Sequence, residues 1–255
     1  MARLVLHFGG NGHASARLDR ARVALAARCP GIELVDLAYP GFEGRPRAGS
    51  LDEFLDALAA QVRGLPGPPV GAFASGIGAL IALGLRTRGE LAGLPLVFEG
   101  PVLWGLEGRA FPRVMRAFPP ARGLPRSALG LGVFQRRFAR EHFESEPDPA
   151  TLAGFFEGYR RCSAFGDFFD WFGPEYLRAL ERDFALNPEG LERITVWVGG
   201  RDRVVGLAEV RATERALQVH LPVVEFAGWG HYPMIDVPEE WADALCLSLA
   251  PAGSV

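Results

Sequence analysis

The sequence predicts an α/β fold: a doubly wound, mostly parallel sheet of about six strands, with one inserted helical segment. Short apolar runs alternate along the chain with longer stretches of helical periodicity, and there is no internal repeat. The runs are apolar throughout rather than at every second residue, which is typical of parallel strands buried on both faces. One long stretch without a strand pattern interrupts the alternation and predicts the insertion.

The elements follow from this pattern in order. Apolar runs predict strands at residues 3–8, 32–37, 70–74, 96–98, 193–198 and 223–226. Helical periodicity predicts helices at residues 15–28, 51–62, 76–88, 208–218 and 238–249. We therefore expect every helix to connect, or to flank, parallel strands of a single sheet.

The insertion spans residues 101–190 and carries 12 of the 18 phenylalanines. It predicts a helical cap, with residues 1–100 and 191–255 forming the core domain. Between Gly108 and Arg140 there are eight arginines and no acidic residue, so this segment carries a charge of +8 and the remainder of the chain −11. We expect ion pairs with acids from Glu141 onward; alternatively, Arg113 and Arg116 are candidates for binding an anionic substrate group.

Composition excludes several classes of function. The net charge of −3 and an isoelectric point near 6.0 argue against a nucleic-acid or membrane-surface role for the whole chain. All 27 basic residues are arginine, which excludes lysine Schiff-base and P-loop chemistry. The uncharged stretch 64–85 contains three prolines and predicts no membrane span. Neither a metal-ligand spacing nor a cofactor motif stands out, so we expect no metal and no organic cofactor.

The three cysteines, Cys29, Cys162 and Cys246, are isolated in the sequence and odd in number. They predict neither a disulfide framework nor a CxxC site. A reducing compartment is then the default, and we expect a cytoplasmic location.

Three chemically active residue types follow predicted strands. Ser75 comes after the third strand, Asp202 after the fifth and His231 after the sixth. Because the carboxyl ends of parallel strands share one edge of a sheet, these side chains are expected to lie close together there. A serine hydroxyl becomes a nucleophile when an imidazole removes its proton and a carboxylate orients that imidazole.

Serine, aspartate and histidine in this order resemble the α/β-hydrolase superfamily. The segment His7–Gly10 resembles its oxyanion loop, and Asp36–Gly44 resembles its Asp-x-Pro-Gly-x-Gly loop. The resemblance covers about residues 3–100 and 191–250 and leaves the cap unmatched. It implies a hydrolase of carboxylic esters or thioesters that acts on a small-molecule acyl substrate, which could be linked to coenzyme A or to a carrier protein. The oligomeric state is not predicted.

The resemblance also assigns roles to residues. It implies that Ser75 is the nucleophile, His231 the base and Asp202 the orienting acid. The backbone amide of Gly76, with one from Gly9 or Gly10, would bind the oxyanion. The turn after the third strand should have small residues two before and two after the nucleophile.

That spacing leaves two registers open for the turn. With Ser75 at the nucleophile position the flanking residues are Phe73 and Ile77, which are bulky. In the other register Ala74 takes the nucleophile position, and the protein would then be a non-catalytic binder with a hydrolase fold.

The sequence also allows other functions and other roles for some residues. Residues 10–15 followed by Asp36 imitate a dinucleotide-binding fingerprint that lacks its third glycine. Glu99 could replace Asp202 as the acid, and C–C bond hydrolysis uses similar folds. Of the remaining histidines, His7 and His13 are expected to support the oxyanion loop, and His142 and His220 to be solvated.

Overall fold

The computed structural model describes residues 2–104, 109–122, 127–128, 131–145 and 147–249. Six strands form one sheet in the order β2-β1-β3-β4-β5-β6, and every neighbouring pair is parallel. This confirms the predicted doubly wound α/β fold. The strands are β1 (Arg3–Phe8), β2 (Ile32–Asp36), β3 (Gly71–Ser75), β4 (Leu96–Glu99), β5 (Ile194–Gly199) and β6 (Val223–Phe226).

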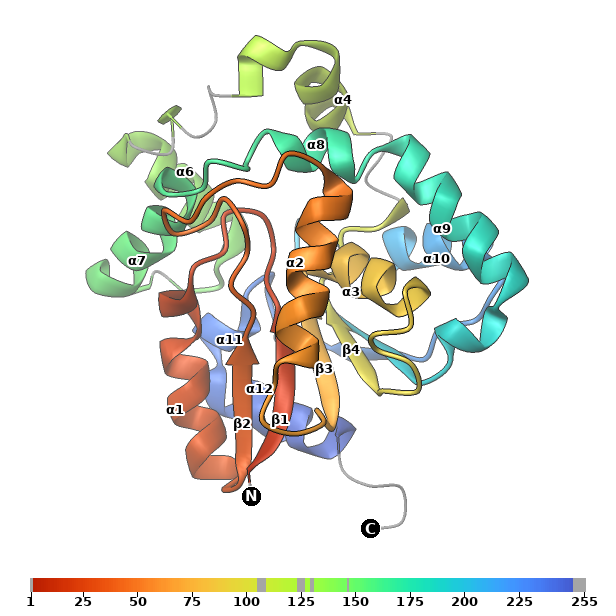
Figure 1. Ribbon diagram of the computed structural model, residues 1–255. Coiled ribbons are helices and arrows are strands. Elements are labelled where there is room, and N and C mark those ends of the chain that lie inside the picture. Colours follow the sequence, from red (N-terminus) through yellow and green to blue (C-terminus); the bar gives the residue numbers. More distant parts are fainter. Residues whose placement is uncertain (1, 105–108, 123–126, 129–130, 146, 250–255) are drawn as a thin grey trace.

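Helices cover both faces of the sheet (Figure 1). On one face lie α1 (Asp19–Arg28), preceded by the 3-10 turn η1 (Ser15–Leu18), with α11 (Pro233–Asp236) and α12 (Pro238–Ser248). On the other lie α2 (Leu51–Arg63), α3 (Gly78–Thr87), α9 (Pro174–Leu186) and α10 (Leu207–Leu217). The central strands β1, β3, β4 and β5 are therefore largely buried between two helical layers, which explains why they are apolar on both faces.

The segment between β4 and β5 is helical in its described residues. It comprises α4 (Ala110–Ala117), η3 (Pro119–Arg122), α6 (Gly132–His142), α7 (Pro149–Arg160), α8 (Asp167–Trp171), α9 and η4 (Pro188–Leu191). The helices α4, α6, α7 and α8 gather beyond the strand ends to which the arrowheads of β1 and β2 point (Figure 1). In contrast α9 packs on α3, where the Tyr176 hydroxyl donates to the Leu80 carbonyl at 2.8 Å. Residues 174–186 therefore belong to the core layer rather than to the predicted cap.

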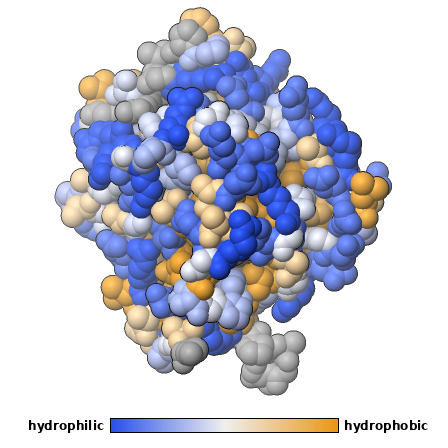
Figure 2. Space-filling view, in the orientation of Figure 1, coloured by the Kyte–Doolittle hydropathy of each residue, from blue (hydrophilic) through white to orange (hydrophobic). Residues whose placement is uncertain are grey.

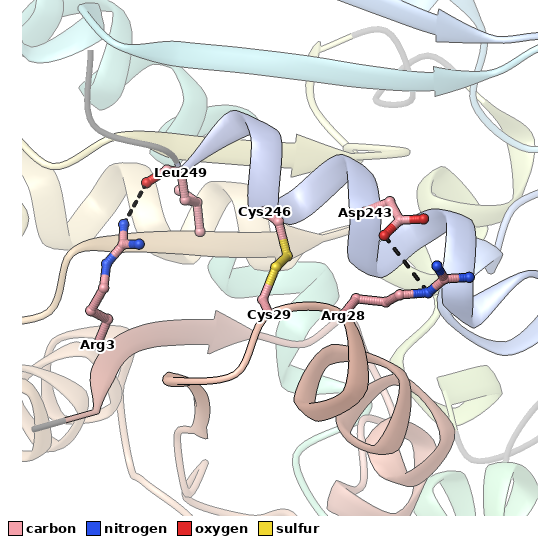
Figure 3. Close-up of a disulfide and its surroundings, with 6 residues drawn as sticks. All are labelled: Arg3, Arg28, Cys29, Asp243, Cys246 and Leu249. Carbon is pink, nitrogen blue, oxygen red and sulfur yellow. Dashed lines mark hydrogen bonds and ion pairs between the residues drawn. A yellow bond between two sulfur atoms is a disulfide. The ribbon is translucent and has the colours of Figure 1, made fainter. Parts of the chain in front are cut away.

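The expectation that the cysteines form no disulfide is wrong. Cys29, at the end of α1, is bonded to Cys246 in α12, with the two Cα atoms 6.3 Å apart (Figure 3). The partners are 217 residues apart in the sequence, so only the packing of α1 against α12 brings them together. The disulfide removes the cysteine argument for a reducing compartment, and the cytoplasmic location stays a prediction.

The surface facing the reader in Figure 2 is largely hydrophilic, with hydrophobic residues in small scattered groups. Within the described ranges, no helix combines the length and the apolar character that crossing a bilayer requires.

Candidate active site

His231 and Asp202 form a hydrogen-bonded pair at the carboxyl edge of the sheet. The Nδ1 atom of His231 lies 2.8 Å from Oδ2 of Asp202, and the two side chains are 9% and 1% exposed. The other carboxylate oxygen of Asp202 accepts the amides of Val204 and Val205 at 2.7 and 3.0 Å. Burial alone would raise the pKa of Asp202, but these bonds and the charge of His231 hold it below its usual value. The pair can therefore hold an imidazole in one orientation and accept a proton at Nε2.

The end of β4 passes directly beneath this pair. A methyl group added at Gly100 would lie 3.3 Å from both Oδ2 of Asp202 and Nδ1 of His231. Gly100 also has a backbone φ of 47°, which glycine adopts without strain. A glycine here lets the strand end approach the pair closely.

The turn between β3 and α3 has its apex at Gly76. The strand ends at Ser75, Gly76 has a φ of 56°, and α3 begins at Gly78. A methyl group at Gly78 would lie 2.1 Å from the Phe8 carbonyl oxygen, so only glycine fits there. The small residues two before and two after the apex are thus Ala74 and Gly78. Both registers expected from the sequence, with Ser75 or Ala74 at the apex, are wrong.

Ser75 lies in the cavity wall but not on the apex. It is the last residue of β3, is in register with Glu99 of β4, and is buried. Since side chains alternate along a strand, Ser75 shares the sheet face of Phe73, whose ring contacts Trp241 of α12. Among the described residues, His231 bonds to Asp202 and makes no hydrogen bond with Ser75.

The predicted oxyanion role of Gly76 is also wrong. Its amide donates to the Glu99 carbonyl at 3.1 Å, as part of the pairing of β3 with β4. The next amide, that of Ile77, opens α3 at the cavity and takes over this candidate role. Of the two loop glycines, Gly10 lines the cavity, whereas a methyl group at Gly9 would overlap the His13 ring at 2.2 Å.

Asp36 organises the loop that carries Gly10. Its carboxylate lies 2.8 Å from His7 Nδ1 and 2.8 Å from His13 Nε2, and it accepts the Ser15 hydroxyl at 2.6 Å. Burial would raise the pKa of Asp36, but the two histidines hold it far below its usual value. The expected supporting role of His7 and His13 is confirmed. The same three groups lie close enough to one another to hold a metal ion.

These bonds also bear on the dinucleotide alternative. A ribose-binding acid needs a carboxylate free to accept hydroxyl groups. The carboxylate of Asp36 is already hydrogen-bonded to His7, His13 and Ser15. It is therefore not free to bind a ribose, which argues against dinucleotide binding.

A cavity of about 590 Å³ opens between the sheet edge and the cap helices and includes Ser75, Gly76 and His231 in its wall. Most of the wall is apolar, including Leu18, Val102, Phe111, Phe165, Phe169 and Met234. A cavity of this size and character accommodates an apolar acyl or aromatic group.

The arginines that reach the cavity are not the expected ones. Arg113 and Arg116 of α4 lie outside its wall, whereas Arg17 and Arg137 line it. Arg17 is 8% exposed, and its guanidinium lies 3.8 Å above the Phe155 ring and donates to the Phe155 carbonyl at 2.8 Å. No sequence signal singled out Arg17, because it lies far from the arginine-rich cap segment.

Three described arginines of the arginine-rich segment form ion pairs. Arg109 pairs with Glu209, Arg122 with Asp170, and Arg137 with Glu141. Within the described residues this supports the simpler of the two expectations, that of salt bridges to acids further along the chain.

Two further titratable groups face the cavity. Burial, together with the charge of Asp202, raises the pKa of Glu99 well above its usual value, and its Oε2 has no partner among the described residues. His142 of α6 is half-buried in the cavity wall rather than solvated. Burial and the charge of His231 lower its pKa to about 4. Asp202, and not Glu99, is thus the acid that faces His231.

The sequence and the structure of this chain are also similar to those of known proteins. The model of the alpha/beta hydrolase family matches residues 4–244. An alpha/beta hydrolase fold protein from Burkholderia ambifaria superposes with a TM-score of 0.71 at 17% identity, covering 96% of this chain and 90% of the other. An esterase from Rhodococcus sp. gives a TM-score of 0.68 at 15% identity, covering 99% and 92%. Haloalkane dehalogenase DbeA from Bradyrhizobium elkani gives a TM-score of 0.68 at 18% identity, covering 97% and 90%. No curated protein matches the sequence.

Proposed function

Because the chain belongs to the alpha/beta hydrolase family, we propose that it hydrolyses carboxylic esters or thioesters, with His231 as general base and Asp202 as the acid that orients it. The observation that carries this proposal is the 2.8 Å bond between His231 and Asp202 in the wall of a largely apolar cavity. An imidazole held in this way can take a proton from an attacking oxygen and return it to the leaving group.

The cavity favours substrates with an apolar acyl or aromatic part. Its wall consists mainly of apolar side chains around the sheet edge, and we assign the backbone amides of Gly10 and Ile77, two residues that line the same space, to the acyl carbonyl oxygen. Two backbone amides so placed stabilise the oxyanion that forms on the acyl carbonyl oxygen. The leaving group could be a simple alcohol or a thiol of coenzyme A or a carrier protein, which only substrate tests separate.

The test is a panel of p-nitrophenyl esters of graded chain length, with acyl-CoA thioesters beside it. The wild type should hydrolyse one or more of these substrates, and the size of the cavity should set the acyl chain length that is hydrolysed fastest. His231→Asn and Asp202→Asn should each lower kcat by about 10²- to 10⁴-fold, because the base is lost or held in the wrong tautomer. His220→Asn is the matched control, since His220 is exposed and outside the cavity wall, and it should keep the wild-type rate.

A second candidate, non-catalytic ligand binding, is favoured by the glycine at the apex of the turn. It predicts that acids and esters bind without turnover and that His231→Asn leaves their Kd unchanged. Turnover of any ester that depends on His231 would exclude it.

A further inference from the structure

We propose that the group that attacks the substrate is a water molecule placed next to Gly76, and that no acyl-enzyme forms. This inference rests on the proposed hydrolase function and assigns its nucleophile.

In a strand-turn-helix elbow the nucleophile occupies the strained residue at the sharp turn, and the residues two positions before and two positions after it are small. Here that residue is Gly76, with a φ of 56°, and its flanking residues are Ala74 and Gly78. The close approach of Gly78 to the Phe8 carbonyl fixes this register, because a shift by one residue would bring a side chain into that contact. The position that elsewhere carries a reactive side chain therefore carries a hydrogen atom.

A group at this position would have room. A methyl group added to Gly76 would have Val102 Cγ2 at 3.8 Å and Gly10 Cα at 3.9 Å as its nearest neighbours, which is ordinary contact. Gly76, Gly10 and Val102 all line the cavity that includes His231. The space over Gly76 thus lies beside the loop that carries Gly10, one of the two candidate oxyanion residues.

The His231–Asp202 pair is tied to the same place by β4. The Val102 amide donates to the Gly76 carbonyl at 3.0 Å, and Gly100 lies in close contact with both members of the pair. A water molecule above Gly76 would therefore share one small region with the base. Ser75 lies one residue earlier, on the sheet face of Phe73, and precedes the turn instead of projecting from it.

The chemical step balances without any further reactant. The water oxygen forms a bond to the acyl carbon while His231 Nε2 takes a water proton, and the carbonyl π electrons move to its oxygen. When the tetrahedral intermediate collapses, the bond to the leaving alkoxide or thiolate breaks and His231 returns the proton to it. The products are a carboxylic acid and an alcohol or thiol.

The test is to create a nucleophile at the apex. Gly76→Ser should become labelled by a fluorophosphonate, with one adduct per chain mapped to position 76 by peptide mass spectrometry, whereas the wild type remains unlabelled. Ala74→Ser is the matched control: it places a hydroxyl two residues earlier and should stay unlabelled. Adding His231→Asn to Gly76→Ser should abolish labelling, because the hydroxyl then lacks its base. A folded Gly76→Ser that resists labelling would overturn the proposal.

Two measurements do not depend on the folding of that variant. Ser75→Ala should retain more than a hundredth of the wild-type kcat, and wild-type enzyme quenched during turnover should show no acyl adduct by intact mass. A loss beyond a hundredfold, or an adduct on Ser75, would overturn the proposal. If the wild type hydrolyses no ester at all, both the proposed function and the attack by water are wrong. Labelling of Gly76→Ser would still show that residue 76 occupies the apex of the turn.

Discussion

The imidazole of His142 lies edge-on to that of His231, with the ring centroids 5.6 Å apart and the ring planes at 70°. The two rings come from opposite sides of the cavity, His142 from α6 of the cap and His231 from the loop after β6. Protonation of His142 therefore places a positive charge against the His231 ring, and burial opposes this protonation as well.

This contact predicts a pH dependence of stability. The pKa of His142 is lowered to about 4, by burial and by the charge of His231, against opposing contributions from the Phe138 carbonyl, Glu141 and Asp202. Between about pH 6.5 and 4 the unfolded chain binds a proton that the native protein does not, so stability falls as the pH falls through this window. His142→Gln should flatten this part of the curve, measured by urea unfolding from pH 4.5 to 7.5. His220→Gln should leave the His142 contribution in place; a slope insensitive to His142→Gln would contradict the assignment.

Glu99 predicts the opposite dependence. Because burial and the charge of Asp202 raise its native pKa, the native protein holds a proton that the unfolded chain loses above about pH 4.5. Stability should then fall as the pH rises above that value, until the native carboxyl itself ionises. Glu99→Gln, which imitates the protonated acid, should reduce the loss of Tm between pH 5 and 8. An equal loss in both proteins would show that Glu99 is ionised in the native state.

Gly78 tests the packing that fixes the register of the turn. Gly78→Ala should destabilise the protein by about 1–3 kcal/mol or more, because the added methyl group would lie 2.1 Å from the Phe8 carbonyl oxygen. Gly67→Ala is the control, since a methyl group there meets no atom within 4 Å, and its effect should be small. Chemical unfolding of both variants measures the difference. Equal stability of the two would mean that the turn sits further from β1.

The bond between Cys29 and Cys246 predicts a redox-dependent stability. Reduction, or replacement of both cysteines by serine, should lower the free energy of unfolding by about 2–4 kcal/mol, because the denatured chain gains the freedom that the cross-link removes. Each single replacement should cost as much as the double one, since either breaks the same bond. Thiol titration of the denatured, unreduced protein should find one reactive thiol, that of Cys162, which lies outside the disulfide. Three free thiols would contradict the bond.

The sequence predicted most of the architecture because strand and helix periodicities are local properties of the chain. The six apolar runs became the six strands with no end shifted by more than one residue, and the chain order of Asp202 and His231 correctly placed them at one edge. The sequence did not predict the disulfide, because its two cysteines are far apart in the chain and only the packing of α1 on α12 brings them together.

The sequence did not predict which residue forms the apex of the β3–α3 turn. Ser75, Gly76 and Ala74 are consecutive small residues, and pattern alone could not tell which of them turns the chain. Only the backbone φ of Gly76 and the contact of Gly78 with β1 decide it. The sequence by itself therefore determined the sheet, its helices and the placement of His231 and Asp202 at one edge, since these follow from periodicity and chain order. The tertiary structure decided which residue forms the apex of the turn, because a shift of one residue depends on contacts between strands far apart in the chain.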